Sequence, residues 1–216
     1  SGPSGAMAAQ TLVEAGKQVA LVDVGITGTD YESFLPNEKF EDLRRSDANQ
    51  NRYLLGDAFE SVDWDGVKVG AQLTPARKHL VKDVSKLIPM ISDTFFPMES
   101  MAYGGLGSGW GLGTYVYSDS ELTRAGLNPQ AMHESYQVVS DRIGIATDRD
   151  DLSTYITGGL ENIQPPLKMD NSAAKLLAAY THKKRELNRR GIYMGNPSMA
   201  LLSNALGNRQ ATKYQD

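Results

Sequence analysis

The N-terminal region places apolar residues first at helical spacing and then in one short continuous run. Residues 6–15 have small apolar side chains three or four positions apart, which predicts a helix. Gly16 suits the left-handed position just past a helix end, and residues 19–22 form a β-rich run that ends at Asp23. The order of turn, helix, buried strand and acid predicts the second half of a βαβ unit. The apolar positions on the helix face are Ala6, Ala9, Leu12 and Val13.

Further along the chain the same patterns predict several shorter elements. Helices are expected at 37–45 and 50–56, a strand at 115–117, and a capped helix that begins at Ser118. The clearest helix covers residues 172–191, where Gly191 is a natural stop and an apolar stripe predicts core packing. That stripe consists of Ala173, Leu176, Leu177, Tyr180 and Leu187.

Composition narrows the class of protein. The 216 residues are 40% hydrophobic and 22% charged, a balance typical of folded soluble proteins. A net charge of -4 gives no electrostatic footprint for nucleic acid, and the basic run at 183–185 reads as a solvated helix face. Without cysteine there is no disulfide or thiolate metal site, which fits a cytoplasmic protein. No apolar run is long enough to span a bilayer, so no membrane span is expected.

Glycine is concentrated in two segments, and the first opens the chain. A glycine placed before Ser1 would complete a G-x-G-x-x-G turn, the dinucleotide-binding fingerprint, and Asp23 lies at the spacing of its ribose-binding acid. In that interpretation the N-terminus of the helix faces a pyrophosphate. A cloning scar or linker ahead of an ordinary helix is the alternative. The predicted cofactor-binding residues of this turn are Gly2, Pro3, Ser4 and Gly5.

The second segment has six glycines between Gly104 and Gly113. So many glycines disfavour a helix or strand interior and favour backbone pressed against a flat or anionic ligand. A flexible linker is the alternative, which the interleaved Leu106, Trp110 and Leu112 argue against.

Together the two segments resemble the glucose-methanol-choline (GMC) oxidoreductase family, in its divergent bacterial branch. The family carries a Gly-Gly-Ser-Ser-x-x-Asn-Gly stretch against its flavin, matched here at Gly104, Gly105 and Gly111. Leu106 and Gly107 replace the two serines and Trp110 the asparagine, which puts side-chain hydrogen bonds to the cofactor in doubt. The likeness is strongest over residues 1–25 and 101–145. It implies cofactor contacts from Gly104, Gly105, Ser108, Gly109, Trp110 and Gly111.

The resemblance implies an α/β, Rossmann-like FAD-binding fold with inserted helical and loop segments. It places an FAD-binding domain at 1–160 and a helical segment at 161–216. It also implies FAD as cofactor and hydride transfer to the flavin from the CH-OH group of a small-molecule alcohol such as a sugar or a sterol-like compound. The electron acceptor stays open. NAD binding by a dehydrogenase domain and a non-catalytic binding or scaffold role are the alternatives.

No catalytic base is identified. The family's catalytic histidine lies near the C-terminus of longer chains, so this chain is expected to be an internal part of a larger enzyme that lacks the first strand and is inactive alone. His79, His133 and His182 share no metal-ligand spacing and read as surface residues, and no metal site is expected. The acids near Asp57 lack the pattern of a calcium-binding loop.

Overall fold

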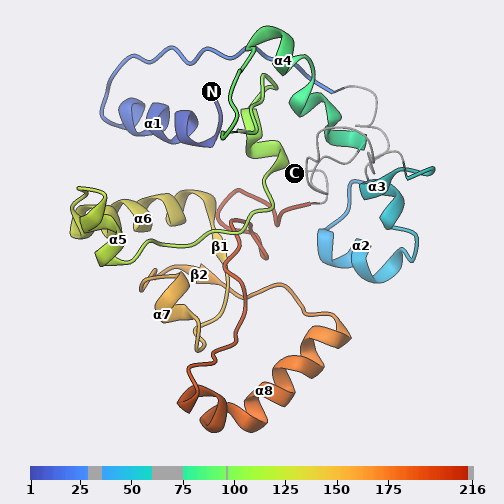
Figure 1. Cartoon of the computed structure of the whole chain (residues 1–216), viewed down its shortest axis with the longest axis vertical. Coiled ribbons are helices and arrows are strands. Elements are labelled where there is room, and N and C mark those ends of the chain that lie inside the picture. Colours follow the sequence, from blue (N-terminus) through green and yellow to red (C-terminus); the bar gives the residue numbers. More distant parts are fainter. Residues whose placement is uncertain (29–35, 60–74, 96, 214–216) are drawn as a thin grey trace. The chain divides into compact units, whose positions relative to one another are not determined.

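The computed structural model describes the whole chain except residues 29–35, 60–74, 96 and 214–216 (Figure 1). The chain divides into two compact units, Ser1–Gly111 with Lys213–Asp216, and Leu112–Thr212. This division differs from the expected boundary at residue 160. Each unit is described separately below as unit 1 and unit 2.

Unit 1 consists of short helices and 3-10 turns joined by extended chain (Figure 1). The predicted helices at 37–45 and 50–56 are confirmed in position, although the first begins three residues later than expected. In the described part of unit 1 the segments pair only at isolated bridges, among them a parallel one between Ile26 and Ala102. The elements are α1 (Pro3–Glu14), α2 (Phe40–Ser46), α3 (Asn51–Leu55), η2 (Pro75–Val81), α4 (Val84–Leu87) and η3 (Gly105–Gly109).

Local sequence explains both ends of α1. Pro3 occupies the first turn, where its missing N-H costs no hydrogen bond and its fixed φ suits the helix. At the other end Gly16 has φ +73, and its N-H donates to the Val13 carbonyl while the Lys17 N-H donates to Leu12. This pair of bonds is the Schellman arrangement that ends many helices at a glycine. The predicted helix and its glycine stop are therefore confirmed.

The buried strand expected at residues 19–22 is absent. The segment is extended, but no strand pairs with it among the described residues, and Leu21 and Val22 are 53% and 83% exposed. A β-rich run becomes a strand only when a neighbouring segment accepts its hydrogen bonds. Without that partner, the β-branched side chains give extended chain and nothing more.

The core of unit 1 that positions the glycine segments is small. Leu80 of η2 and Ala102 are almost fully buried, and Val81 packs against them. A Cβ atom at Gly109 would lie 2.6 Å from Leu80 Cδ1, so a side chain at this position would require the buried Leu80 side chain to shift. Unit 1 thus holds the second glycine segment against buried leucine.

Unit 2 contains six elements, and caps define where several begin. Ser118 and Glu121 form a reciprocal capping box at the start of α5, which confirms the predicted capped helix. Asp170 accepts hydrogen bonds from the Ser172 and Ala173 N-H groups and begins the longest helix. The elements are α5 (Asp119–Arg124), α6 (Pro129–Ile143), β1 (Ile145–Ala146), α7 (Ser153–Ile156), β2 (Ile163–Gln164) and α8 (Asn171–Arg189).

β1 and β2 form a two-stranded parallel sheet in which Ile145 lies opposite Ile163 (Figure 1). Met199 extends this pairing through antiparallel bridges to Ala146 and Gly113. The fold is therefore mixed α/β. The strand expected at 115–117 does not form, since only Val116 bonds to a neighbour and Tyr115 and Tyr117 are about 60% exposed.

The apolar stripe of α8 was expected to face a core, and this prediction is confirmed in part. Tyr180 is buried and Leu177 and Leu187 are half-buried, but Leu176 is 59% exposed and Ala173 is also exposed. The first turns of the helix therefore have little cover. Periodicity identified the helix and its glycine stop at Gly191, whose φ is +75, but not the depth of its burial.

Candidate functional site

The N-terminal turn leads directly into α1 and exposes peptide N-H groups. Gly2 has φ +96, a conformation that other residues rarely adopt. Its carbonyl accepts the first helical hydrogen bond from Ala6, and the N-H groups of Ser4 and Gly5 have no acceptor among the described residues. Free N-H groups and the positive end of the helix dipole make this turn suitable for an anion.

Gly5 is not at a point of unusually close packing. A Cβ atom here would lie 3.8 Å from the Leu21 side chain, which is an ordinary van der Waals distance. Residues 19–22, to which Leu21 belongs, form no strand, so no sheet lies against Gly5 in the described part of unit 1.

Asp23 joins the two glycine segments. Its carboxylate accepts hydrogen bonds from the Ser1 hydroxyl, from the Gly25 N-H at 2.8 Å and from the Gly104 N-H at 3.2 Å. The terminal ammonium of Ser1 lies 3.5 Å away. These contacts, with the Ser1 hydroxyl first, lower the pKa of Asp23 from 3.8 to about 2. The carboxylate is thus ionised, and its Oδ2 atom is already bonded to Ser1 and Gly104.

The second glycine segment lies against the start of α1. Gly104 and Gly105 have φ values of +77 and +65, so the chain turns there in a way that glycine permits. A Cβ atom at Gly105 would lie 3.5 Å from the Gly2 Cα, and one at Gly107 would lie 2.8 Å from the Pro3 ring. The glycine-rich run forms one short 3-10 turn, η3, rather than an irregular loop.

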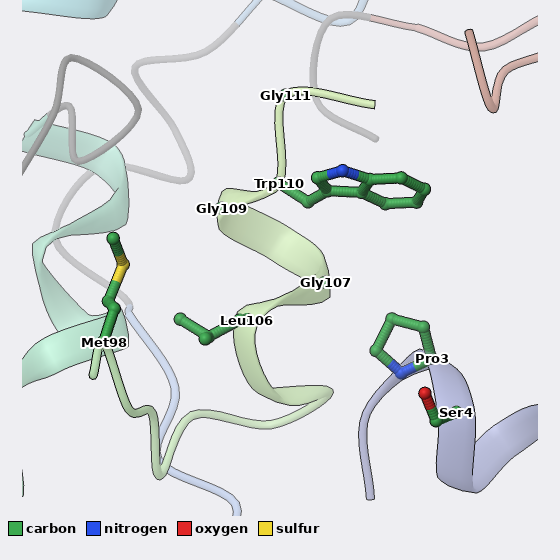
Figure 2. Close-up of a pocket in the computed structure, with 8 residues that line it drawn as sticks. All are labelled: Pro3, Ser4, Met98, Leu106, Gly107, Gly109, Trp110 and Gly111. Carbon is green, nitrogen blue, oxygen red and sulfur yellow. The ribbon is translucent and has the colours of Figure 1, made fainter. Parts of the chain in front are cut away.

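A pocket of about 440 Å³ opens between the start of α1 and η3 (Figure 2). Trp110, 44% exposed, extends over the side of the pocket where Pro3 lies, while Leu106 and Met98 lie toward the other side (Figure 2). None of the lining residues is charged. They are Pro3, Ser4, Met98, Leu106, Gly107, Gly109, Trp110 and Gly111.

Five residues predicted as cofactor contacts line this pocket, namely Pro3, Ser4, Gly109, Trp110 and Gly111. The other six predicted cofactor contacts do not line the pocket: Gly2, Gly5, Asp23, Gly104, Gly105 and Ser108. Leu106 and Gly107 also line the pocket, although the sequence did not predict them as cofactor contacts. Met98 was missed because nothing in its sequence context distinguishes it from a core methionine.

The lining residues fit a flat, uncharged ring better than a phosphate group. Trp110 and Pro3 offer apolar faces, and glycine backbone allows close approach of a ligand. The volume lies within the usual range for cofactor pockets. The anion-binding N-H groups of Ser4 and Gly5 lie at its edge, where α1 begins. A cofactor that combines a ring with a phosphate would use both features.

A second charged cluster lies in unit 2. Asp151 contacts the Lys184 ammonium at 2.6 Å and accepts a hydrogen bond from the Tyr180 hydroxyl at 2.5 Å. Lys184 first and then Tyr180 lower the pKa of Asp151 to about 2. Tyr180 is 5% exposed, so this cluster fastens α8 to the chain before α7. Lys184 therefore belongs to a specific pair, whereas the sequence had predicted a solvated face.

Histidines and acids elsewhere do not form a reaction centre in the part of the chain that the structure describes. No group of three or more potential metal ligands occurs there, and no histidine lines the pocket. His133 contacts Asp119 at 2.6 Å on the surface of unit 2. Asp63 and Asp65 lie outside the described residues. Among the helices described, none has both the length and the apolar character needed to cross a membrane.

Comparisons with known proteins add no family to these observations. No protein-family model matches the chain, and neither curated proteins nor solved structures gave a significant match.

Proposed function

We propose that unit 1 binds FAD at the pocket between α1 and η3, and that the protein acts as an FAD-dependent oxidoreductase on CH-OH groups. The observation that carries the proposal is the junction at Asp23. Asp23 bonds to Gly104, which lies 81 residues further along the sequence, and the two glycine segments border one uncharged pocket. Such a junction is expected of a cofactor site and is not required of two unrelated turns.

The ring of the flavin is assigned to the apolar side of the pocket. Trp110 offers a half-exposed indole face, and aromatic rings stack with a favourable energy of about 0.5–1.5 kcal/mol beyond the burial of area. Trp110 stands where the resembling family has an asparagine. In this chain the ring is therefore held by stacking rather than by a side-chain amide.

The phosphates of the cofactor are assigned to the start of α1. The Ser4 and Gly5 N-H groups lack acceptors among the described residues, and a helix N-terminus favours negative charge. Asp23 holds the Gly104 turn against the first turn, and the ribose of the cofactor is assigned to the same carboxylate. The Rossmann-like arrangement of the FAD-binding fold stays part of this proposal.

When bound, FAD supplies the redox chemistry by accepting a hydride from the alcohol carbon. The residues of this chain bind and orient the cofactor, and their apolar side chains line one side of the pocket. No described residue is assigned as the base that takes the hydroxyl proton.

Ligand titration of the full chain tests the binding proposal. We expect FAD to bind and riboflavin to bind more weakly, with NAD at least tenfold weaker than FAD. Trp110→Ala should weaken FAD and riboflavin binding about tenfold, equivalent to about 1.4 kcal/mol, while Trp110→Phe should retain most of the affinity. Tyr103→Ala is the matched control, because Tyr103 is 70% exposed in the same segment and does not line the pocket.

Two results would overturn the proposal. Absence of FAD binding would remove the flavin assignment, and tighter binding of NAD would replace it with the dinucleotide alternative. If FAD binds, anaerobic mixing with a panel of alcohols tests the reaction. Bleaching of the flavin absorbance near ~450 nm is expected with a substrate, as a reduced cofactor requires.

A further inference from the structure

The centre of unit 2 contains two buried residues whose hydroxyl groups have no partner. Thr147 is 2% exposed and Ser198 is 1% exposed. Neither hydroxyl oxygen has a hydrogen-bond partner among the described residues, and the same holds for the Tyr136 hydroxyl on α6. Buried hydroxyls are normally hydrogen-bonded, so two of them in one small core call for an explanation.

The pairing of the chain places these two residues opposite each other. Ala146 and Met199 exchange both backbone hydrogen bonds, at 2.9 and 3.0 Å, in an antiparallel bridge. The next opposed pair is therefore Thr147 and Ser198, and directly opposed residues of an antiparallel pair point to the same face. Their Cβ atoms are expected about 4.5–5.5 Å apart. The two hydroxyls do not bond to each other.

Surrounding groups do not supply the missing bonds. Thr157, also buried, donates its hydroxyl hydrogen to the Ser153 carbonyl at 2.7 Å. Asp150 follows Thr147 by three positions in the sequence. Its carboxylate already accepts hydrogen bonds from the Asn196 N-H at 2.6 Å and the Leu152 N-H at 2.9 Å. A cation bound here would have only neutral hydroxyls as remaining ligands, which is a poor site for a cation.

A bridging ligand must therefore be small and neutral, and it must form a hydrogen bond with each hydroxyl. Water meets all of these requirements, and buried waters usually make two to four bonds to polar groups that the protein leaves unpaired. We propose that one ordered water molecule binds between the Thr147 and Ser198 hydroxyls and links the segment after β1 to the segment around Met199. This inference concerns unit 2 and is independent of the proposed cofactor site.

A double-mutant cycle on the full chain tests the water bridge. Thr147→Val and Ser198→Ala each remove one hydroxyl with little change in shape. If water bridges the pair, each single variant leaves the water and the other hydroxyl one bond short, and the melting temperature should fall by roughly 2–4 °C. The double variant should lose clearly less than the sum of the two single losses, because no unpaired hydroxyl then remains.

The opposite sign would overturn the inference. If the hydroxyls are simply unpaired, each substitution should raise the melting temperature or leave it unchanged, and the effects should add. Thr157→Val is the matched control, since it removes a buried threonine hydroxyl that has a partner, and it shows the size of the loss for one such bond. A cross-relaxation signal between a long-lived water and the Thr147 or Ser198 amide would identify the ligand directly. Absence of that signal in the wild-type chain would also refute the bridge.

Discussion

Gly107→Ala tests whether the two glycine segments pack as closely as the structure indicates. The added Cβ atom would lie 2.8 Å from Pro3 Cγ and 3.0 Å from Pro3 Cδ, where ordinary contacts begin at about 3.4 Å. The Pro3 ring cannot rotate away, because it is closed onto the backbone in the first turn of α1. Either α1 or η3 must therefore move by several tenths of an ångström.

The magnitude follows from the cost of overpacking a close contact. Inserting a methyl group into such a contact costs about 1–3 kcal/mol. For a chain of this size each kcal/mol lowers the melting temperature by about 2–4 °C, so a fall of roughly 2–12 °C is expected. If FAD binds only the closed arrangement, the same cost weakens its affinity by about 5- to 150-fold, at tenfold per 1.4 kcal/mol.

Gly111→Ala is the control for stability in this experiment. Gly111 also lines the pocket, but a Cβ atom there has no other heavy atom within 4 Å. Its melting temperature should equal that of the wild type or rise slightly, as expected when alanine replaces glycine at an unstrained position. Thermal unfolding followed by circular dichroism gives the comparison. Equal melting temperatures for Gly107→Ala and Gly111→Ala would refute the close packing of α1 against η3.

The remaining predictions concern charge and the core. Asp23 has a lowered pKa in the folded state, so its contribution to stability is complete above its ordinary pKa of 3.8 and is lost as the pH falls from about 4 to about 2. Asp23→Asn should therefore flatten the pH dependence of the unfolding free energy in that window. Denaturant titrations at several pH values measure this free energy, and the same pH dependence in Asp23→Asn and the wild type would contradict the role of Asp23. Lys184→Met should raise the pKa of Asp151 toward its ordinary value, which carboxylate NMR titration measures. Leu122→Ala, at a site that is 2% exposed, should cost about 2–5 kcal/mol, whereas Leu176→Ala at 59% exposure should cost much less; equal losses in urea unfolding would show that Leu122 is not in a core.

Helices were predictable where their signals are local. The capping residues Ser118 and Glu121, the stop at Gly191 and the glycine after α1 all act within three or four residues, so the sequence alone places the start of α5 and the ends of α8 and α1. The start of α2 was misplaced by three residues because no side-chain cap marks it.

Strands were predicted less well, because a strand depends on its neighbours. Residues 19–22 and 115–117 have β-rich composition, yet neither forms a ladder in the described structure. The strands that do form, β1 and β2, have two residues each, and nothing in their composition distinguishes them from loop. Hydrogen bonds between distant segments, rather than propensity, decide which extended segments pair.

For the candidate site, the sequence by itself determined the residue types: two glycine segments, a helix that begins at the first of them, an acid at Asp23 and an indole at Trp110. Only the tertiary structure decided that Asp23 bonds to Gly104 across 81 residues and that Met98, Leu106 and Gly107 complete the pocket. It also showed that the Asp23 carboxylate is already engaged by Ser1. Backbone freedom and capping are properties of neighbouring residues, so the sequence displays them directly. Contacts between distant segments depend on the path of the whole chain, which local pattern does not contain.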